Sequence, residues 1–400
     1  MNITLKRTEE QLELVKAMAS KDRDVAYEAQ AALAEFIAPV LAEVIQQAPT
    51  LSNMFKTLSF TADDNPSIPL DLYFDITDED YIEIWSQNAP GGLPSNQVAP
   101  TTQELKFTTY RLDTALSFDK KYVARSRMDV LSKTFTRMAQ ELLLKMETTS
   151  ANMILTAQVN ASTNGIFHTL LNTQKGRILL HDFNRMLTHS KRINTSWTGG
   201  TPIGGTGGIT DLLVSPEVVE NLREMAYNPV NTRGLDGTQT VTGTGNAVDN
   251  DVSVTVDNKG AGVIPATDSM RDAIYSNGGI PEFYGINIQE TLELGPAAKY
   301  TNVWKDLLPT GATGVRGAGK ALNAYTYDAA DDFILGIDRS RADMMVRAVA
   351  TDADNGSELS LVPDDQFVSR QQKVGYYGSL EEGRMILDNR VLYGMVVDAA

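Results

Sequence analysis

The first fifty residues carry apolar side chains at helical spacing. Thr8 and Gln11 have the spacing of a capping box, and Val15 and Met18 follow on one helical face. A helix is therefore predicted to begin near Glu9.

A second helical pattern extends from Val25 to Ile37 and meets Pro39. Because proline lacks a backbone donor, we expect an interruption there, after which a new turn continues to about Pro49. Both helices are amphipathic and precede any recognisable domain. They are predicted to form an arm that needs another surface to lie on.

The period changes to two between residues 58 and 118. Apolar side chains occupy alternate positions from Ile68 to Phe74. The same alternation returns at Leu105 and Phe107 and at Leu116 and Phe118. Residues 88–94 concentrate proline and glycine, which predicts a turn. The segment is therefore interpreted as a long excursion with strands at both ends.

Most of the excursion has one sign of charge, since every charged residue between Thr57 and Leu105 is acidic. A two-stranded hairpin is at best marginally stable in water, and like charges repel one another. The excursion is therefore expected to rest against a basic surface.

The longest helical pattern follows, with apolar residues spaced by three or four from Met128 to Met146. Ser126 and Asp129 suit its first turn, so one helix is predicted from about Ser126 to Val159. Its polar positions are more basic than acidic. They indicate either a solvated helix face or a face toward a polyanion.

Shorter elements fill the rest of the chain. A buried-type strand at 209–214 leads through Ser215 into a helix at 217–227. Residues 228–262 are rich in Gly, Asn, Thr and Asp and predict a surface loop, in which only Val252, Val254 and Val256 suggest a strand. Further strands of a mixed sheet are predicted at 286–288, 333–337, 344–349 and within 374–397.

Composition narrows the functional classes. The chain has 400 residues and no cysteine, which excludes disulfides and thiolate chemistry. Its length allows two or three subdomains. A net charge of −16 disfavours sequence-specific binding to nucleic acid. No apolar run is long enough to span a membrane, so no membrane partner is expected.

The motifs that suggest enzymes are incomplete. Residues 314–320 match a phosphate-binding loop up to Lys320, but Ala321 replaces the hydroxyl that binds Mg²⁺. Ser215 lacks the flanking glycines of a hydrolase nucleophile. The three histidines, His168, His181 and His189, lack metal-site spacing. We therefore expect no catalytic residue, metal or cofactor.

Four stretches carry a family resemblance, namely 210–224, 283–288, 333–338 and 366–375. In their order and spacing they resemble the major capsid proteins of tailed bacteriophages, which have the Hong Kong 97 fold. The resemblance implies an α+β chain with an N-terminal helical arm, an extended β-hairpin loop, a spine helix in a peripheral domain and a mixed-sheet axial domain. The implied boundaries are arm 1–56, hairpin loop 57–118, peripheral domain 119–198, axial domain 199–335 with its loop 228–262, and return strands 336–400.

The resemblance also implies a non-enzymatic function. Copies would form hexamers and pentamers that close into an icosahedral virion shell around double-stranded DNA, assembled in a bacterial cytoplasm. Portal, scaffolding and optional decoration proteins are the implied partners, and DNA contacts would be non-specific. Contacts between copies are expected to join excursion residues to arginines: Asp75, Asp78, Glu79, Asp80, Glu83 and Trp85 with Arg125, Arg127, Arg339, Arg341 and Arg347.

One departure from the family changes an expectation. Some members join neighbouring copies through a lysine of the extended loop, but this chain has no lysine between Lys56 and Lys106. No such isopeptide crosslink is expected. The arm is expected to be retained, which favours a separate scaffolding protein.

Two alternatives stay open. A cellular nanocompartment shell, similar to an encapsulin, shares the fold and encloses enzymes instead of DNA. A phosphate-binding or hydrolytic enzyme built on residues 314–320 belongs to a different class.

Overall fold

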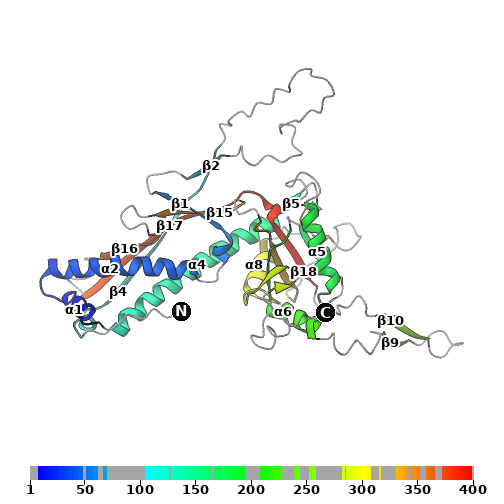
Figure 1. Cartoon of the computed structure of the whole chain (residues 1–400), viewed down its shortest axis with the longest axis horizontal. Coiled ribbons are helices and arrows are strands. Elements are labelled where there is room, and N and C mark those ends of the chain that lie inside the picture. The colour runs from blue at the N-terminus through cyan, green and yellow to red at the C-terminus, as the bar shows by residue number, and fades with distance from the viewer. Residues whose placement is uncertain are drawn as a thin grey trace, which may run out of the picture. The chain divides into compact units, whose positions relative to one another are not determined.

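The structure is a computed structural model that describes most of the chain. The described residues are 8–47, 51–61, 66–69, 104–125, 128–163, 166–173, 175–193, 208–227, 238–243, 252–257, 282–283, 285–307, 315–316, 330–340, 344–351, 357–364 and 372–398. They form an α+β protein of two compact units (Figure 1). Unit 1 is drawn from residues 1–74, 82–153 and 342–387, and unit 2 is drawn mainly from 154–341 and 388–400.

The arm helices form near the predicted positions. Helix α1 spans Glu9–Ala17, and the Thr8 hydroxyl accepts a hydrogen bond from the Gln11 N–H at 3.4 Å, as the capping pattern predicts. Helix α2 spans Arg23–Gln47. A short 3₁₀ helix, η1 (Leu51–Met54), follows.

The expected interruption at Pro39 is wrong, because α2 continues through it. Ile37 before the proline and Leu41 after it are both buried in the same core, while Pro39 itself is exposed. Burial of each large aliphatic side chain contributes roughly 1.5–3 kcal/mol, which together offsets the roughly 3 kcal/mol cost of an interior proline.

The arm does not lack a surface of its own, which corrects the sequence interpretation. Val15 and Met18 from the α1 region and Leu33 and Leu41 of α2 are buried in one cluster with residues of the long helix and of the sheet. The hydroxyl of Tyr376, a fully buried sheet residue, contacts the Met18 sulfur at 3.9 Å. The amphipathic faces are thus covered by the chain's own unit 1.

The predicted long helix is α4, 32 residues from Met128 to Val159. A short basic helix, α3 (Lys120–Ala124), precedes it. Phe135 and Met138 of α4 are buried against the sheet. Gly378 permits this contact, since a Cβ there would overlap the Met138 methyl group.

Five strands make the sheet of unit 1, and β17 (Lys373–Ile386) is its centre. On one side β17 pairs antiparallel with β4 (Tyr110–Asp119), and on the other it pairs with β16 (Ser360–Asp364) and β15 (Met345–Thr351). Strand β1 (Lys56–Thr61) completes the sheet parallel to β15.

The excursion has a paired base. Strand β2 (Ser67–Pro69) pairs antiparallel with β3 (Glu104–Lys106), with Ile68 opposite Leu105. The strands predicted at the two ends of the segment thus pair with each other. Residues 70–103 lie outside the described part of the chain.

Unit 2 contains a mixed sheet of seven strands in the order β11-β12-β8-β14-β18-β7-β13. Its described part includes helices α5, α6 and α8, and two small hairpins, β5–β6 and β9–β10, lie outside the sheet. The bounds are β5 Ser162–Thr163, β6 Ile166–Phe167, β7 Thr169–Leu171, α5 Leu180–Ile193, β8 Asp211–Val214, α6 Pro216–Tyr227, β9 Thr238–Gly243, β10 Val252–Asp257, β11 Glu282–Phe283, β12 Ile286–Glu290, α8 Lys299–Leu307, β13 Val315–Arg316, β14 Asp332–Ile337, η5 Asn389–Val391 and β18 Leu392–Val397.

Two expectations about the later strands need correction. Within 228–262, β10 contains the strand that Val252, Val254 and Val256 suggested, but it pairs antiparallel with β9, which was expected to be loop, with Val241 opposite Val254. The two closing strands do not share one sheet, because β17 belongs to unit 1 and β18 to unit 2. The chain thus divides its closing strands between two cores. No helix among the described residues is both long and apolar enough to cross a membrane.

Candidate functional site

The base of the acidic excursion is held by a small apolar cluster. Phe60 of β1 and Phe107, just after β3, are buried together with Val346 and Ala348 of β15. The Phe107 N–H donates to the Pro66 carbonyl at 3.0 Å, which extends the β2–β3 pairing toward the sheet. The two ends of the excursion therefore leave unit 1 from one packed position.

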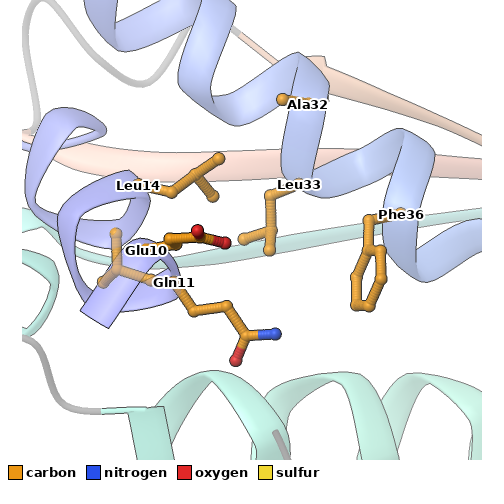
Figure 2. A pocket seen from close by; sticks show the side chains of 7 residues that line it. Glu10, Gln11, Leu14, Ala32, Leu33 and Phe36 are labelled. Atoms are coloured by element: carbon orange, nitrogen blue, oxygen red, sulfur yellow. The ribbon is translucent and has the colours of Figure 1, made fainter. Parts of the chain in front are cut away.

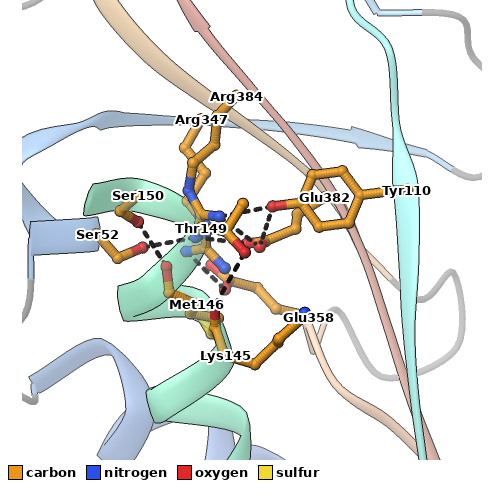
Figure 3. A network of polar contacts seen from close by, with 10 residues as sticks. All are labelled: Ser52, Tyr110, Lys145, Met146, Thr149, Ser150, Arg347, Glu358, Glu382 and Arg384. Carbon is orange, nitrogen blue, oxygen red and sulfur yellow. Dashed lines mark hydrogen bonds and ion pairs between the residues drawn. The ribbon is translucent and has the colours of Figure 1, made fainter. Parts of the chain in front are cut away.

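Beside this cluster lies a buried charged network, which we call the clamp: Ser52, Tyr110, Arg347, Glu358, Glu382 and Arg384 (Figure 3). Arg347 of β15 and Arg384 of β17 stand directly opposite each other in the sheet. Such a like-charge pair is unfavourable by itself. The clamp therefore needs an anion between the two guanidinium groups.

Glu382 supplies that anion. Its Oε2 lies 2.8 Å from Arg347 Nε, and its Oε1 lies 2.7 Å from Arg384 Nη1. Glu358 Oε2 lies 3.5 Å from Arg347 Nη1. Two guanidinium groups thus face two carboxylates, and the buried charge is balanced.

The clamp joins four segments that are distant in the sequence. Tyr110, the first residue of β4, donates from its hydroxyl to Glu382 Oε1 at 2.7 Å and accepts from Arg384 Nη1 at 2.6 Å. Arg384 Nη2 donates to Ser52 Oγ of η1 at 2.9 Å. Burial raises the pKa of Tyr110, with the positive charge of Arg384 opposing the shift, and burial lowers the pKa of Arg384, with the negative charge of Glu382 opposing the shift. The clamp therefore fixes the segments on both sides of the excursion.

The sequence interpretation missed the clamp. The only signal is Glu381-Glu382-Gly383-Arg384, a run of charges within a strand that otherwise has a buried pattern. Charged residues are almost never fully buried unless they are paired. The partner positions are up to 332 residues away in the chain, so the pattern alone did not identify them.

The arginines expected to receive the excursion have different surroundings. Arg125 is exposed at the end of α3. Arg339, 46% exposed at its side chain, lies 3.9 Å from the Asp211 carboxylate. Arg347 is only 4% exposed and is occupied by the clamp, so we withdraw it as a contact candidate. Arg127, Arg341 and the excursion residues Asp75, Asp78, Glu79, Asp80, Glu83 and Trp85 lie outside the described residues.

A groove lies between the two arm helices (Figure 2). It has a volume of about 320 Å³, with Glu10, Gln11 and Leu14 of α1 on one side and Leu33 and Phe36 of α2 on the other. The Phe36 side chain is 56% exposed despite being apolar. The groove is therefore an apolar depression with acidic and amide groups at one edge.

The residues that suggested enzyme chemistry have structural roles. Ser215 Oγ accepts from the Val218 N–H at 3.2 Å, which caps α6, and it donates to the Asp332 carboxylate. Burial raises the pKa of Asp332 to about 6, partly opposed by the Ser215 hydrogen bond. The ring of His168 is buried and hydrogen-bonds through Nδ1 to the Leu392 carbonyl at 3.0 Å.

No group of three or more histidine, aspartate or glutamate side chains in the described part of the chain is arranged to hold a metal ion. Of the 314–320 stretch, only Val315 and Arg316 are described, as strand β13 next to β7. The remainder of that stretch lies outside the described residues.

Comparison with known proteins gives matches among solved structures only. No family model matches the sequence, and no curated protein sequence is similar to it. The capsid of the cyanophage P-SCSP1u is 12% identical, with 87% of each chain covered and a TM-score of 0.44. The capsid of an empty GTA particle is 11% identical, covering 89% of this chain and 95% of that chain, with a TM-score of 0.44. The SrpI encapsulin complex from Synechococcus elongatus is 10% identical, covering 75% and 77%, with a TM-score of 0.37.

Proposed function

We propose that this chain is a viral structural protein, the major capsid protein of a tailed bacteriophage. Many copies associate as hexamers and pentamers and close into an icosahedral shell around double-stranded DNA. The observation that carries the proposal is the excursion: a long, wholly acidic segment that leaves unit 1 and returns to it at one paired base. A hairpin of this charge is stabilised by contact with another molecule.

The clamp supports this proposal because it gives the excursion a rigid origin. Contacts between copies require each contacting element to leave the body in a defined direction. The buried ion pairs of Glu382 and the hydroxyl of Tyr110 hold η1, β4, β15 and β17 together at that origin. In this proposal the clamp has a positioning role and takes no part in chemistry.

The acidic excursion then binds a basic region of a neighbouring copy. Among the described candidates, Arg125 is exposed at the end of α3, where Lys120 adds positive charge and Lys121 is partly neutralised by Asp119 at 3.3 Å. Arg339 is the second described candidate, although Asp211 neutralises part of its charge. Arg127 and Arg341 complete the proposed set.

Electron microscopy of the purified full-length chain tests the proposal. Closed shells, or rings of five and six copies with irregular shells, are the expected results. Uniform closed shells from the chain alone would argue against a separate scaffolding protein. A chain that stays monomeric at high concentration, in low and high salt, would contradict the proposed function.

The contents of particles from the producing cells decide between the two shell functions. Nuclease-protected double-stranded DNA supports the phage capsid. Enclosed protein without DNA supports a nanocompartment. For the enzyme alternative, an ATPase assay with Lys320→Ala as the control gives the answer, since activity abolished by that substitution would favour it.

A further inference from the structure

Helix α2 presents an exposed apolar stripe along the side that borders the groove. Ala32, Phe36 and Val40 are exposed and recur every four residues, and Glu43 extends the same face. Phe36 is 56% and Val40 is 40% exposed. Apolar side chains grouped in this way beside a depression are typical of a protein-binding surface.

The outer face of α4 carries exposed basic residues. Lys133, Arg137 and Gln140 are exposed on one side of this helix, with the acidic Glu141 at the border of that side, and Leu144 on the same side is 57% exposed. Leu144 is therefore an apolar side chain about two helical turns beyond Arg137. Its position on a regular helix within unit 1 gives it a fixed direction.

The two faces match in spacing. Phe36 and Glu43 are seven residues apart on α2, and Leu144 and Arg137 are seven residues apart on α4 in the reverse order. At 1.5 Å per residue both separations are about 10 Å. An antiparallel pairing of the helices therefore places leucine beside phenylalanine and arginine beside glutamate.

We propose that α2 of one copy binds α4 of a second copy, with Leu144 of the second copy filling the groove between α1 and α2. This inference rests on the proposed function, because it requires copies to associate. The groove volume of about 320 Å³ is ample for one leucine side chain. Glu10 at the groove edge and Glu43 beyond it complement the basic α4 face.

The charges favour this pairing over contact between two α2 helices. Two copies of α2 packed on each other through this stripe place a glutamate, Glu43, on both sides of the contact. Like charges across an interface oppose binding. A contact between different faces also leaves a free α4 face on one copy and a free α2 face on the other, so rings and larger arrays follow.

A charge exchange tests the polar half of the pairing in the full-length chain. Glu43→Arg alone and Arg137→Glu alone are each expected to weaken association between copies roughly tenfold, because attraction becomes repulsion. The double variant is expected to recover most of that loss. Association is measured by sedimentation and by particle yield in electron micrographs.

Two substitutions on the same helices serve as matched controls. Glu35→Arg and Lys145→Glu change exposed charges that lie about 100° around each helix from the proposed contact. They are expected to associate as the wild type does. Single variants that also associate as the wild type does, or a double variant that is as weak as the single ones, would overturn the pairing.

Cysteine crosslinking tests the apolar half, since the natural chain contains no cysteine. Under mild oxidation an equal mixture of Phe36→Cys and Leu144→Cys chains is expected to give a disulfide-linked dimer on a non-reducing gel. Neither variant alone is expected to do so, because a disulfide needs Cα atoms about 4.4–6.8 Å apart. A dimer from Phe36→Cys alone would instead establish contact between α2 helices.

The outcomes separate this inference from the proposed function. If wild-type chains form shells but the mixture gives no crosslink and the charge variants assemble normally, the α2–α4 pairing is wrong and the shell function stands. If wild-type chains never associate, the proposed function fails first. Circular dichroism spectra equal to the wild type's confirm that each surface variant is folded.

Discussion

The arm and the excursion were both expected to need another surface, and the two segments differ in whether the chain itself provides one. The arm helices bury Val15, Met18, Leu33 and Leu41 in the core of unit 1. The excursion is attached through three-residue strands at its base, a small apolar cluster and the clamp.

The difference follows from the kind of side chain that each segment carries. An apolar helix face is satisfied by any complementary apolar surface, and α4 and the sheet of unit 1 provide one. A wholly acidic segment needs opposite charge, and the chain has a net charge of −16. An amphipathic pattern therefore predicts that one face of a helix is buried. Which element covers that face depends on the surrounding fold.

The largest expected effect comes from breaking the clamp. Glu382→Ala leaves Arg347 and Arg384 facing each other in the interior, and removal of one partner from a buried ion pair costs about 3–5 kcal/mol of unfolding free energy. Denaturant unfolding followed by circular dichroism measures the loss. Glu13→Ala, an exposed substitution in α1, is the control and is expected to change stability by less than about 0.5 kcal/mol. Equal stability of the two variants would mean that the clamp does not hold the excursion base.

A smaller loss is expected from the arm. Met18 is fully buried, and Met18→Ala is expected to lower the unfolding free energy by about 2–3 kcal/mol, the lower part of the usual range because a short terminal helix can relax into the space. The same unfolding experiment applies, with Lys16→Ala on the exposed side of α1 as the control. A change no larger than that of the control would show that the arm is not held by the core.

Salt distinguishes the two segments more directly. If the acidic excursion binds a basic surface of another copy, raising the ionic strength from about 50 to 500 mM is expected to weaken association roughly tenfold. The apolar packing of the arm should not weaken, so the stability difference between wild type and Met18→Ala should persist. Analytical ultracentrifugation at both ionic strengths gives the result, and association that ignores salt would remove the charge-based role of the excursion.

The smallest expected effect is the absence of a covalent link. Because the chain has no lysine between Lys56 and Lys106, particles boiled in denaturant are expected to run as one band near 43.7 kDa. A ladder of multiples of that mass would show that copies are joined covalently through some other residue.

Much of the fold was determined by local sequence. The Thr8 cap, the long apolar repeat of α4 and the Ser215-Pro216 start of α6 each depend on residues close together in the chain, and each element formed where it was predicted. The acidic character of the excursion is likewise a property of the sequence alone.

The tertiary structure decided what these elements contact. Helix α2 continues through Pro39 because its burial on both sides outweighs the lost hydrogen bond. Strands β17 and β18 entered different sheets, and Ser52, Tyr110 and Glu382 met in one clamp, although no local pattern links them. Periodicity reports which face of an element is buried, but partners distant in the chain are chosen by the packing and charge balance of the whole unit.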